Sequence, residues 1–523
     1  MIPVARVHSH ATSLPALLVS AVGVVAIVLL AHVAPPAYVA LLLAAIGAGL
    51  LVLRHPWLAG VLLVASVPVQ QVGAVGAGGA SLTATRICLL VALAAAIIRW
   101  SALAQPVILH RGLALYACFL LVLLLSVHGA TNVSAGISEL ARWCIAFVAF
   151  GCFLQWCDPA RPMHVVMLAG AVVAATAAEA LYGLFQSVRA VGPESFVIGG
   201  GVTRAFGTFG RPNTFAGFLE FGPFLAAALG LYFAMRTTTA LRLYRQIRLQ
   251  GFVAATPARR RLFWLVALMV AFFASGSLAF LGIVASFSRG AWVGVAGGIL
   301  AFALLYGPRT RLLTLLAIPL VIVVVASGLL ARLPGSLEER VVSISDVARP
   351  FDASSIPITD ENFAAVERMA HWQAGWRMFK DHPILGVGPG NFNTLYPSYY
   401  VREEFRFSQG HAHNYYIHLL AETGILGLVA YLTLLGFFLF LGLRIVIACV
   451  EPLPRAIALG CTVTLVSLSI HNLFENLHVL NLSIMYSSLF CLLVASHRMW
   501  RGSGTSACFA AGENVEYSAN EHS

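Results

Sequence analysis

The chain has 523 residues, of which 59% are hydrophobic and only 10% charged, with a formal net charge of +11 and a mean hydropathy of +0.87. Soluble domains carry roughly 25% charged residues, so this composition excludes a soluble globular protein and predicts an integral membrane protein. The positive charge is spread over many short connections, so it gives no support for nucleic-acid binding, which needs a clustered basic face.

Apolar runs recur along the whole chain, and a transmembrane helix needs about 20 mainly apolar residues. We therefore expect an all-α integral membrane protein with about 12 to 14 transmembrane helices and one large, partly helical external loop. The weakest run is the third, which Pro68 and two glutamines interrupt. The runs lie near residues 13–33, 36–53, 57–72, 82–99, 112–128, 137–156, 164–188, 212–235, 262–286, 290–306, 310–331, 414–447, 455–471 and 477–496.

Arginines predict the orientation of these helices, because short cytoplasmic loops are enriched in basic residues. With the N-terminus inside, most arginine-bearing connections fall on the cytoplasmic side, among them residues 236–261 with seven arginines. Both termini are then cytoplasmic, and residues 332–412, which hold ten of the 21 acidic residues, lie outside. We expect 236–261 to be an ordinary cytoplasmic loop; the alternative is an amphipathic segment that lies on anionic lipid.

The same pattern divides the chain into four regions. An N-terminal transmembrane bundle covers 1–331, an external loop domain 332–412, and C-terminal transmembrane helices 413–498, while the polar tail at 499–523 is predicted to be disordered. The first apolar run is longer than the about 7–15 residues of a signal-peptide core and further spans follow it, so we expect it to be retained as a helix.

The external loop has an ordered composition. Apolar residues spaced by three and four from Phe363 to Phe379 predict an amphipathic helix over 363–380, which Asp381-His382-Pro383 ends. Three glycines between 386 and 390 then indicate a tight turn. We expect the aromatic residues after it to form the core of the loop in preference to stacking on sugar rings. They are Phe392, Tyr396, Tyr399, Tyr400, Phe405 and Phe407.

Ionisable residues cluster where this loop re-enters an apolar run, and such costly groups indicate a functional site. Asn414 is predicted to cap a helix that begins at Tyr415, which leaves His413 near the positive end of the helix dipole. That position favours a neutral imidazole able to act as a general base. Glu422 follows Asn414 by about two turns and would share that face. The alternative is that His413 has only a structural role, in capping the helix or packing against its neighbours.

Four arginines lie at external helix ends, against the positive-inside bias. Arg289 stands between two apolar runs, and Arg368 lies at the start of the predicted loop helix. Two guanidinium groups that converge there would match the oxygens of a diphosphate. Arg204 and Arg211 add two more external charges. The alternative is that these side chains snorkel or pair with a loop carboxylate.

His471 and Glu475 form a second polar pair at an external helix end, spaced by four residues. They either line the same cavity or only form a hydrogen-bonded pair with each other. No histidine, cysteine or carboxylate set in the external segments has the spacing of metal ligands, and the chain has no CxxC pair. We therefore expect neither a metal nor a cofactor.

Four segments follow one another in a characteristic order, with the large external loop before the last. The set resembles the O-antigen ligase and O-antigen polymerase superfamily of polytopic membrane glycosyltransferases. The segments are Gly207-Thr208-Phe209-Gly210-Arg211-Pro212-Asn213, Ser288-Arg289-Gly290-Ala291, Arg368 with Trp372 through His382-Pro383 to Asn391-Phe392, and His413-Asn414 through Glu422-x-Gly424-x-x-Gly427.

The resemblance implies a transferase that moves a glycan from undecaprenyl diphosphate to an acceptor hydroxyl, that of lipid A-core, at the periplasmic face of the bacterial inner membrane. It implies inversion at the anomeric carbon and no nucleotide sugar, cofactor or obligatory metal. Arg289 and Arg368 would bind the donor diphosphate, and His413 would activate the acceptor. Supporting residues would be Arg204, Arg211, Asn414, Glu422 and His471. The extra N-terminal runs and the cysteine-bearing tail depart from the family pattern.

Other functions fit the same residues. A polysaccharide polymerase would use a second lipid-linked glycan as acceptor, and an oligosaccharyltransferase would use a protein serine or threonine. A transporter is the alternative from another class, but it predicts inverted repeats and broken helices in both halves, and the sequence shows neither clearly. The expected partners are the lipid-linked glycan donor, a glycan, lipid or protein acceptor, and membrane lipids.

Overall fold

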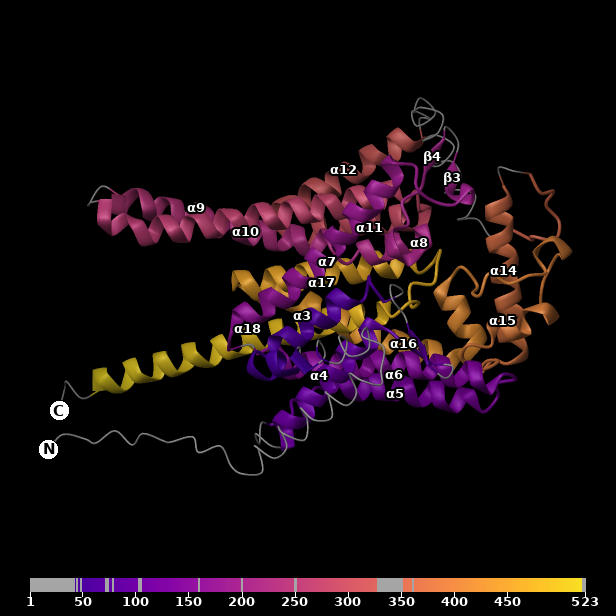
Figure 1. Ribbon diagram of the computed structural model, residues 1–523. Coiled ribbons are helices and arrows are strands. Elements are labelled where there is room, and N and C mark those ends of the chain that lie inside the picture. Colours follow the sequence, from indigo (N-terminus) through magenta and orange to yellow (C-terminus); the bar gives the residue numbers. More distant parts are fainter. Residues whose placement is uncertain are drawn as a thin grey trace.

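Long α-helices packed side by side make up nearly all of the computed structural model (Figure 1). The predicted run at 13–33 and ten of the 18 residues of the run at 36–53 fall outside the residues that it describes. Those residues are 43, 46–47, 49–70, 75–77, 80–101, 106–158, 160–198, 201–248, 252–326, 351–359 and 362–519.

Within these residues, nine helical segments are long and apolar enough to cross a membrane. The predicted all-α polytopic membrane fold is therefore confirmed. The segments belong to α4 (Ala84–Ser101), α6 (Val133–Trp156), α7 (Pro162–Val188), α8 with α9 (Pro212–Leu219 and Pro223–Arg248), α10 (Phe252–Ala285), α11 (Arg289–Tyr306), α16 (Tyr415–Ala448), α17 (Pro452–His471) and α18 (Leu482–Ala519).

Three further helices are shorter or less regular. The weak run at 57–72 forms only the ten-residue helix α3 (Trp57–Ser66), which is too short to span a bilayer alone. The others are α5 (Arg111–Val127) and α12 (Pro308–Ala326). Two small antiparallel hairpins complete the bundle, β1 (Val75–Ala77) with β2 (Ala80–Leu82), and β3 (Val197–Ile198) with β4 (Val202–Thr203).

The basic connection at 236–261 is largely helical, where a loop was expected. Helix α9 continues to Arg248 and α10 begins at Phe252, so the arginines lie on two helices that extend beyond the bundle (Figure 1). Arginine and leucine are good helix formers, which explains why both helices continue. Helix α18 likewise runs on to Ala519, through most of the tail for which composition predicted disorder.

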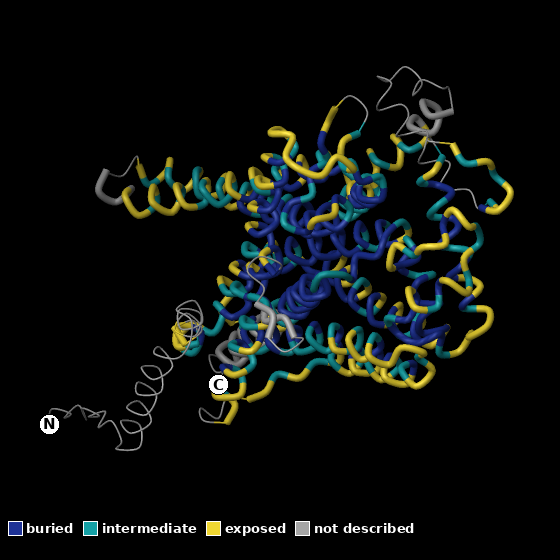
Figure 2. Tube along the Cα trace, turned by 45° about the vertical axis from the view of Figure 1, so that its right-hand side comes forward, coloured by how far each residue is buried: buried dark blue, intermediate teal, exposed yellow. Residues whose placement is uncertain are grey.

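The most buried helices form the centre of the bundle (Figure 2). In the apolar window of α18, 89% of the residues are buried, and in that of α17 72%, against 22% for α4. The connection between α17 and α18 therefore emerges from the best-packed part of the molecule, which holds its side chains in place.

The described part of the predicted external loop, residues 351–359 and 362–412, packs over one end of the bundle. Helix α14 (Phe363–Asp381) confirms the predicted amphipathic helix and its end, and α15 (Phe392–Leu395) follows it. Phe392 and Tyr396 are fully buried and Phe405 is 3% exposed, so these three aromatic residues form loop core as expected, whereas Phe407 is 71% exposed.

The glycine-rich turn after α14 is joined to α16 by its backbone. Gly388 N–H donates to the carbonyl oxygen of Glu422 (2.9 Å). The Glu422 carboxylate in turn accepts from the N–H groups of Gly390 (2.8 Å) and Phe392 (3.0 Å). Gly424 interrupts α16 with φ 63° and ψ −165°. Glu422 therefore anchors the loop, and its carboxylate does not join the polar group around His413.

Candidate active site

His413 lies at the junction of the loop and α16. Asn414 caps the helix as predicted, because its side chain accepts from the N–H groups of Tyr416 (3.0 Å) and Ile417 (3.2 Å). His413 itself has φ 53°, an unusual value for a residue with a side chain. The indole N–H of Trp372 donates to its carbonyl oxygen (3.2 Å). These contacts hold the His413 ring in place where the helix begins.

Two histidines and a carboxylate meet at this point. Glu475, on the connection between α17 and α18, lies with Oε1 3.1 Å from His411 Nε2 and 3.6 Å from His413 Nδ1. The side chains of His413 and Glu475 are 14% and 6% exposed. Both ring nitrogens of His413 are shielded and lack a hydrogen-bond partner among the described residues. A buried polar group without a partner calls for a functional explanation.

The tautomer of His411 follows from its neighbours. The backbone N–H of His413 donates to His411 Nδ1 (3.1 Å), so the ring proton belongs on Nε2, which faces Glu475. Burial lowers the pKa of His411 to about 3, although Glu475 opposes this effect. The imidazole of His411 is therefore neutral at pH 7 and donates to the carboxylate.

Glu475 is held in the ionised form. The Asn213 side-chain amide donates to Glu475 Oε2 (2.5 Å), and the Arg204 guanidinium donates to the side-chain oxygen Oδ1 of Asn213 (3.2 Å). Burial by itself would raise the pKa of the Glu475 carboxyl. The neighbouring imidazoles and the positive charge of Arg368 outweigh burial and hold that pKa well below its usual range.

The cluster has the composition of a metal site, which the sequence analysis missed because Glu475 is remote in sequence. One ligand atom from each of His411, His413 and Glu475 lies within 4.8 Å of the others. A metal-bound imidazole, however, offers a lone pair on one nitrogen and carries its proton on the other. His411 carries its proton on the nitrogen that faces Glu475, so this arrangement favours a hydrogen-bonded carboxylate–imidazole group.

Two of the predicted arginines act electrostatically on this group, and a third lies near His471. The charge of Arg368 contributes to the low pKa of Glu475, and Arg211 is one of the charges that act on His411. Arg289 is the first residue of α11, and a Cβ at the following Gly290 would lie 2.7 Å from His471 Cδ2. Arginines of α11 and α14, and Arg211 just before α8, therefore lie on the side of the bundle that carries the site.

His471 and Glu475 do not pair with each other, so the second of the two alternatives left open by their spacing is wrong. Helix α17 ends at His471, whose Nδ1 lies 2.5 Å from Oε1 of the fully buried Glu220. Ser467 donates to the other oxygen of Glu220 (2.8 Å). Glu220 was missed in the sequence, although an acidic residue inside the apolar run 212–235 is a signal for such a site.

Fold and site together define a polytopic membrane protein with a cationic, imidazole-bearing site at one end of its bundle. The family model described as O-antigen ligase matches residues 274–432, a range that contains Arg289, Arg368 and His413. This part of the chain is therefore similar to the O-antigen ligase family, and the predicted resemblance to that superfamily is confirmed. No curated protein matches the chain.

Proposed function

We propose that this protein transfers a glycan from undecaprenyl diphosphate to a hydroxyl group of an acceptor, lipid A-core, on the periplasmic side of a bacterial inner membrane. The observation that carries the proposal is the His413 ring, buried without a hydrogen-bond partner beside Glu475. The O-antigen ligase match over 274–432 supports the reaction class.

In the proposed reaction, the acceptor oxygen bonds to the anomeric carbon while the bond from that carbon to the diphosphate breaks. His413 Nε2 takes the hydroxyl proton, and undecaprenyl diphosphate leaves. Nδ1 of His413 faces Glu475 at 3.6 Å, so the carboxylate favours the proton on Nδ1 and leaves Nε2 as the acceptor. Attack from the face opposite the diphosphate inverts the anomeric centre.

The arginines have a separate role in this proposal. Arg289 and Arg368 bind the donor diphosphate and stabilise the negative charge that develops on it as the glycosidic bond breaks. Arg204 holds Asn213 against Glu475 and so positions the carboxylate beside His413. Both termini and the helical extension of α9 and α10 then lie in the cytoplasm, opposite the site.

The acceptor is tested by supplying purified full-length protein with labelled glycan on undecaprenyl diphosphate. Three acceptors are offered separately: lipid A-core, a second lipid-linked glycan, and a serine- and threonine-containing protein. Label on lipid A-core supports the proposal. Chain extension would identify a polymerase, and labelled protein an oligosaccharyltransferase. Movement of intact donor across a sealed vesicle without any new glycosidic bond would indicate a transporter.

Replacing Arg289 or Arg368 by lysine should lower transfer strongly, although the charge is kept. Lysine lacks the planar fork that contacts two phosphate oxygens at once, and each lost charge-assisted hydrogen bond is worth about 1.5–3 kcal/mol, or roughly 10- to 100-fold. Steady-state transfer at varied donor concentration measures the effect. The exposed Arg189→Lys is the matched control. Full turnover with unchanged donor affinity in both site variants would exclude bidentate contacts.

Transfer should persist in excess EDTA and without ATP. The donor already carries its leaving group, and we assign the offsetting positive charge to the arginines and not to a divalent ion. The measurement compares initial rates of purified protein with and without chelator. A rate that disappears with EDTA and returns with Mg²⁺, Mn²⁺ or Zn²⁺ contradicts this proposal. In that case His411, His413 and Glu475 are the first ligands to replace.

A further inference from the structure

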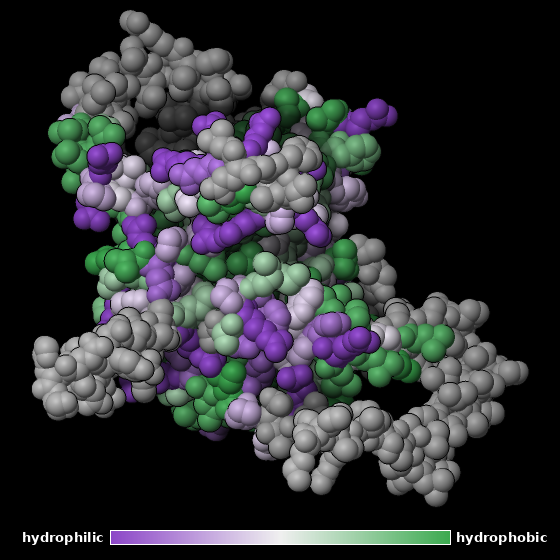
Figure 3. Space-filling model, turned by 90° about the vertical axis from the view of Figure 1, so that its left-hand side faces the viewer, coloured by the Kyte–Doolittle hydropathy of each residue, from purple (hydrophilic) through white to green (hydrophobic). Residues whose placement is uncertain are grey.

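A cavity of about 780 Å³ lies between α4, α6 and the start of α7. Figure 1 shows α14 at the other end of the bundle. The lining of the cavity combines cationic groups with an extended apolar wall. The cationic residues are Arg54, Arg99 and Arg161. The apolar wall includes Leu93, Ile97, Leu113, Phe147 and Trp156. This end of the molecule also gathers hydrophilic side chains on its surface (Figure 3).

The segment before α5 closes one side of the cavity. Ile108 N–H donates to the Gln155 side-chain oxygen (2.9 Å), and the Gln155 amide donates back to the Ile108 carbonyl oxygen (3.0 Å). This pair of hydrogen bonds fixes the wall against α6. Beside it Leu109 is 79% exposed and Val107 47%, so apolar side chains line the rim where the bilayer would lie.

Arginines outnumber carboxylates in the described lining of the cavity. The Arg99 guanidinium lies over the Trp156 ring, 5.6 Å from its centroid. Such stacking uses the face of the guanidinium and leaves its edge N–H groups for an anion. Asp158 is the one carboxylate in the lining. It lies 3.9 Å from Arg161, whose side chain is 72% exposed while its own is 47% exposed, so this solvated pair neutralises little of the positive charge.

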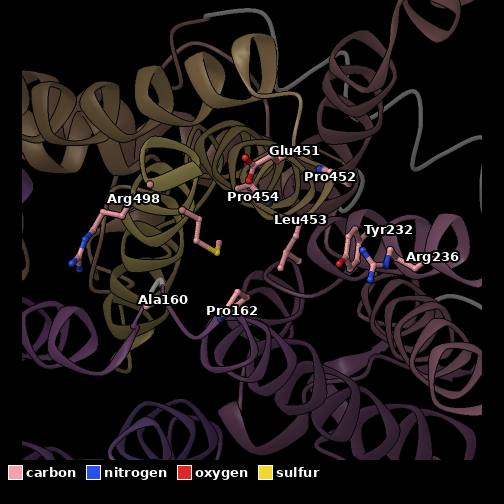
Figure 4. Close-up of a pocket in the computed structure, with 11 residues that line it drawn as sticks. Ala160, Pro162, Tyr232, Arg236, Glu451, Pro452, Leu453, Pro454 and Arg498 are labelled. Carbon is pink, nitrogen blue, oxygen red and sulfur yellow. The ribbon is translucent and has the colours of Figure 1, made fainter. Parts of the chain in front are cut away.

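A second cavity of about 660 Å³ at the same end has a different character. Figure 4 shows its two arginines, Arg236 and Arg498, on opposite sides, with Glu451 near its upper edge. The proline-rich start of α17 forms part of the wall. Its two arginines lie on opposite sides, whereas three arginines and a longer apolar wall line the cavity between α4 and α6, which is therefore the better candidate for an anionic lipid.

We propose that the cavity between α4 and α6 binds one anionic glycerophospholipid of the surrounding bilayer. The headgroup phosphate lies among Arg54, Arg99 and Arg161, and the acyl chains follow the apolar wall past Ile97 and Leu113. Guanidinium groups match phosphate oxygens in pairs, and basic pockets between transmembrane helices are established receptors for lipid headgroups. This binding does not depend on the proposed transfer reaction, because the cavity is remote from His413.

The test is native mass spectrometry of full-length protein purified in a neutral detergent and titrated with phosphatidylglycerol. Wild-type protein should retain phosphatidylglycerol at much lower concentration than phosphatidylcholine. Each arginine near a lipid phosphate contributes about fivefold in affinity, so combining Arg99→Gln with Arg161→Gln should weaken binding roughly 30-fold. Arg161→Gln alone changes an exposed side chain and should weaken it about fivefold.

Arg189→Gln, an exposed arginine at the end of α7 remote from the cavity, is the matched control and should keep wild-type affinity. Equal retention of phosphatidylcholine would show an unselective apolar groove and overturn the proposal. Unchanged phosphatidylglycerol affinity in the double variant would do the same. Inorganic phosphate is the third arm: if it displaces the lipid at similar concentration, the site takes free phosphate and not a phospholipid.

Discussion

Replacing His413 by asparagine should lower glycan transfer about 10²- to 10⁴-fold, the usual contribution of a general base. Asparagine tolerates the left-handed φ of 53° at this position, so the backbone keeps its conformation while the base is lost. His413→Ala should lose as much activity and in addition carry a backbone strain of about 1 kcal/mol or more. Initial rates of purified protein, with donor in excess, measure the loss.

Comparing the two variants separates chemistry from folding. Both should elute as wild type in size-exclusion chromatography, and only the alanine variant should unfold at a lower temperature. His128→Ala, an exposed histidine at the same end of the bundle, should keep full activity. Near-normal transfer in His413→Asn would show that the ring only packs at the helix start, and the base would then have to be sought elsewhere.

Replacing Gly424 by alanine should separate the external loop from the bundle and cost about 3 kcal/mol or more. Gly424 has a φ of 63°, which side-chain-bearing residues rarely adopt. An added Cβ would lie 2.3 Å from the backbone carbon and oxygen of Ile384. Because these are backbone atoms, the glycine-rich turn after α14 would have to move away from α16. Thermal unfolding and limited proteolysis of the 382–412 region measure the effect.

Gly436→Ala is the matched control in the same helix. An added Cβ there meets nothing within 4 Å and the backbone is helical, so the variant should be as stable as wild type or slightly more stable. If Gly424→Ala unfolds and is cleaved like wild type, the backbone contact between 383–388 and 421–426 is not what fixes the loop on the bundle.

Local patterns were sufficient for the helices and for the start of the site. The spacing of apolar residues predicts α14 and its end at Asp381, and Asn414 before Tyr415 predicts the cap of α16. Both depend on interactions within a few residues, which sequence records directly. Composition was a poorer guide at 236–261 and in the tail, because polar residues such as arginine and glutamate also form helices well.

The partners of the site residues could not be predicted in this way. The spacing of His471 and Glu475 left open whether they pair with each other. Helix α17 ends at His471 and the chain turns, so Glu475 reaches His411 and His413 while His471 reaches Glu220. Glu422 was expected to face the same site, yet its carboxylate accepts two backbone N–H groups of the glycine-rich turn. The end of α17 therefore decided the partners of Glu475 and His471, and the glycine-rich turn packed on α16 decided the partners of Glu422.

By itself the sequence determined the membrane class, most of the helices, the general base candidate and the arginines expected at the donor, because each depends on composition or on neighbours along the chain. Only the tertiary structure decided which carboxylate accompanies His413 and which tautomer His411 adopts. It also showed that Arg54, Arg99 and Arg161 line one cavity. These facts depend on contacts between residues remote in sequence, which form only when buried helices pack against one another.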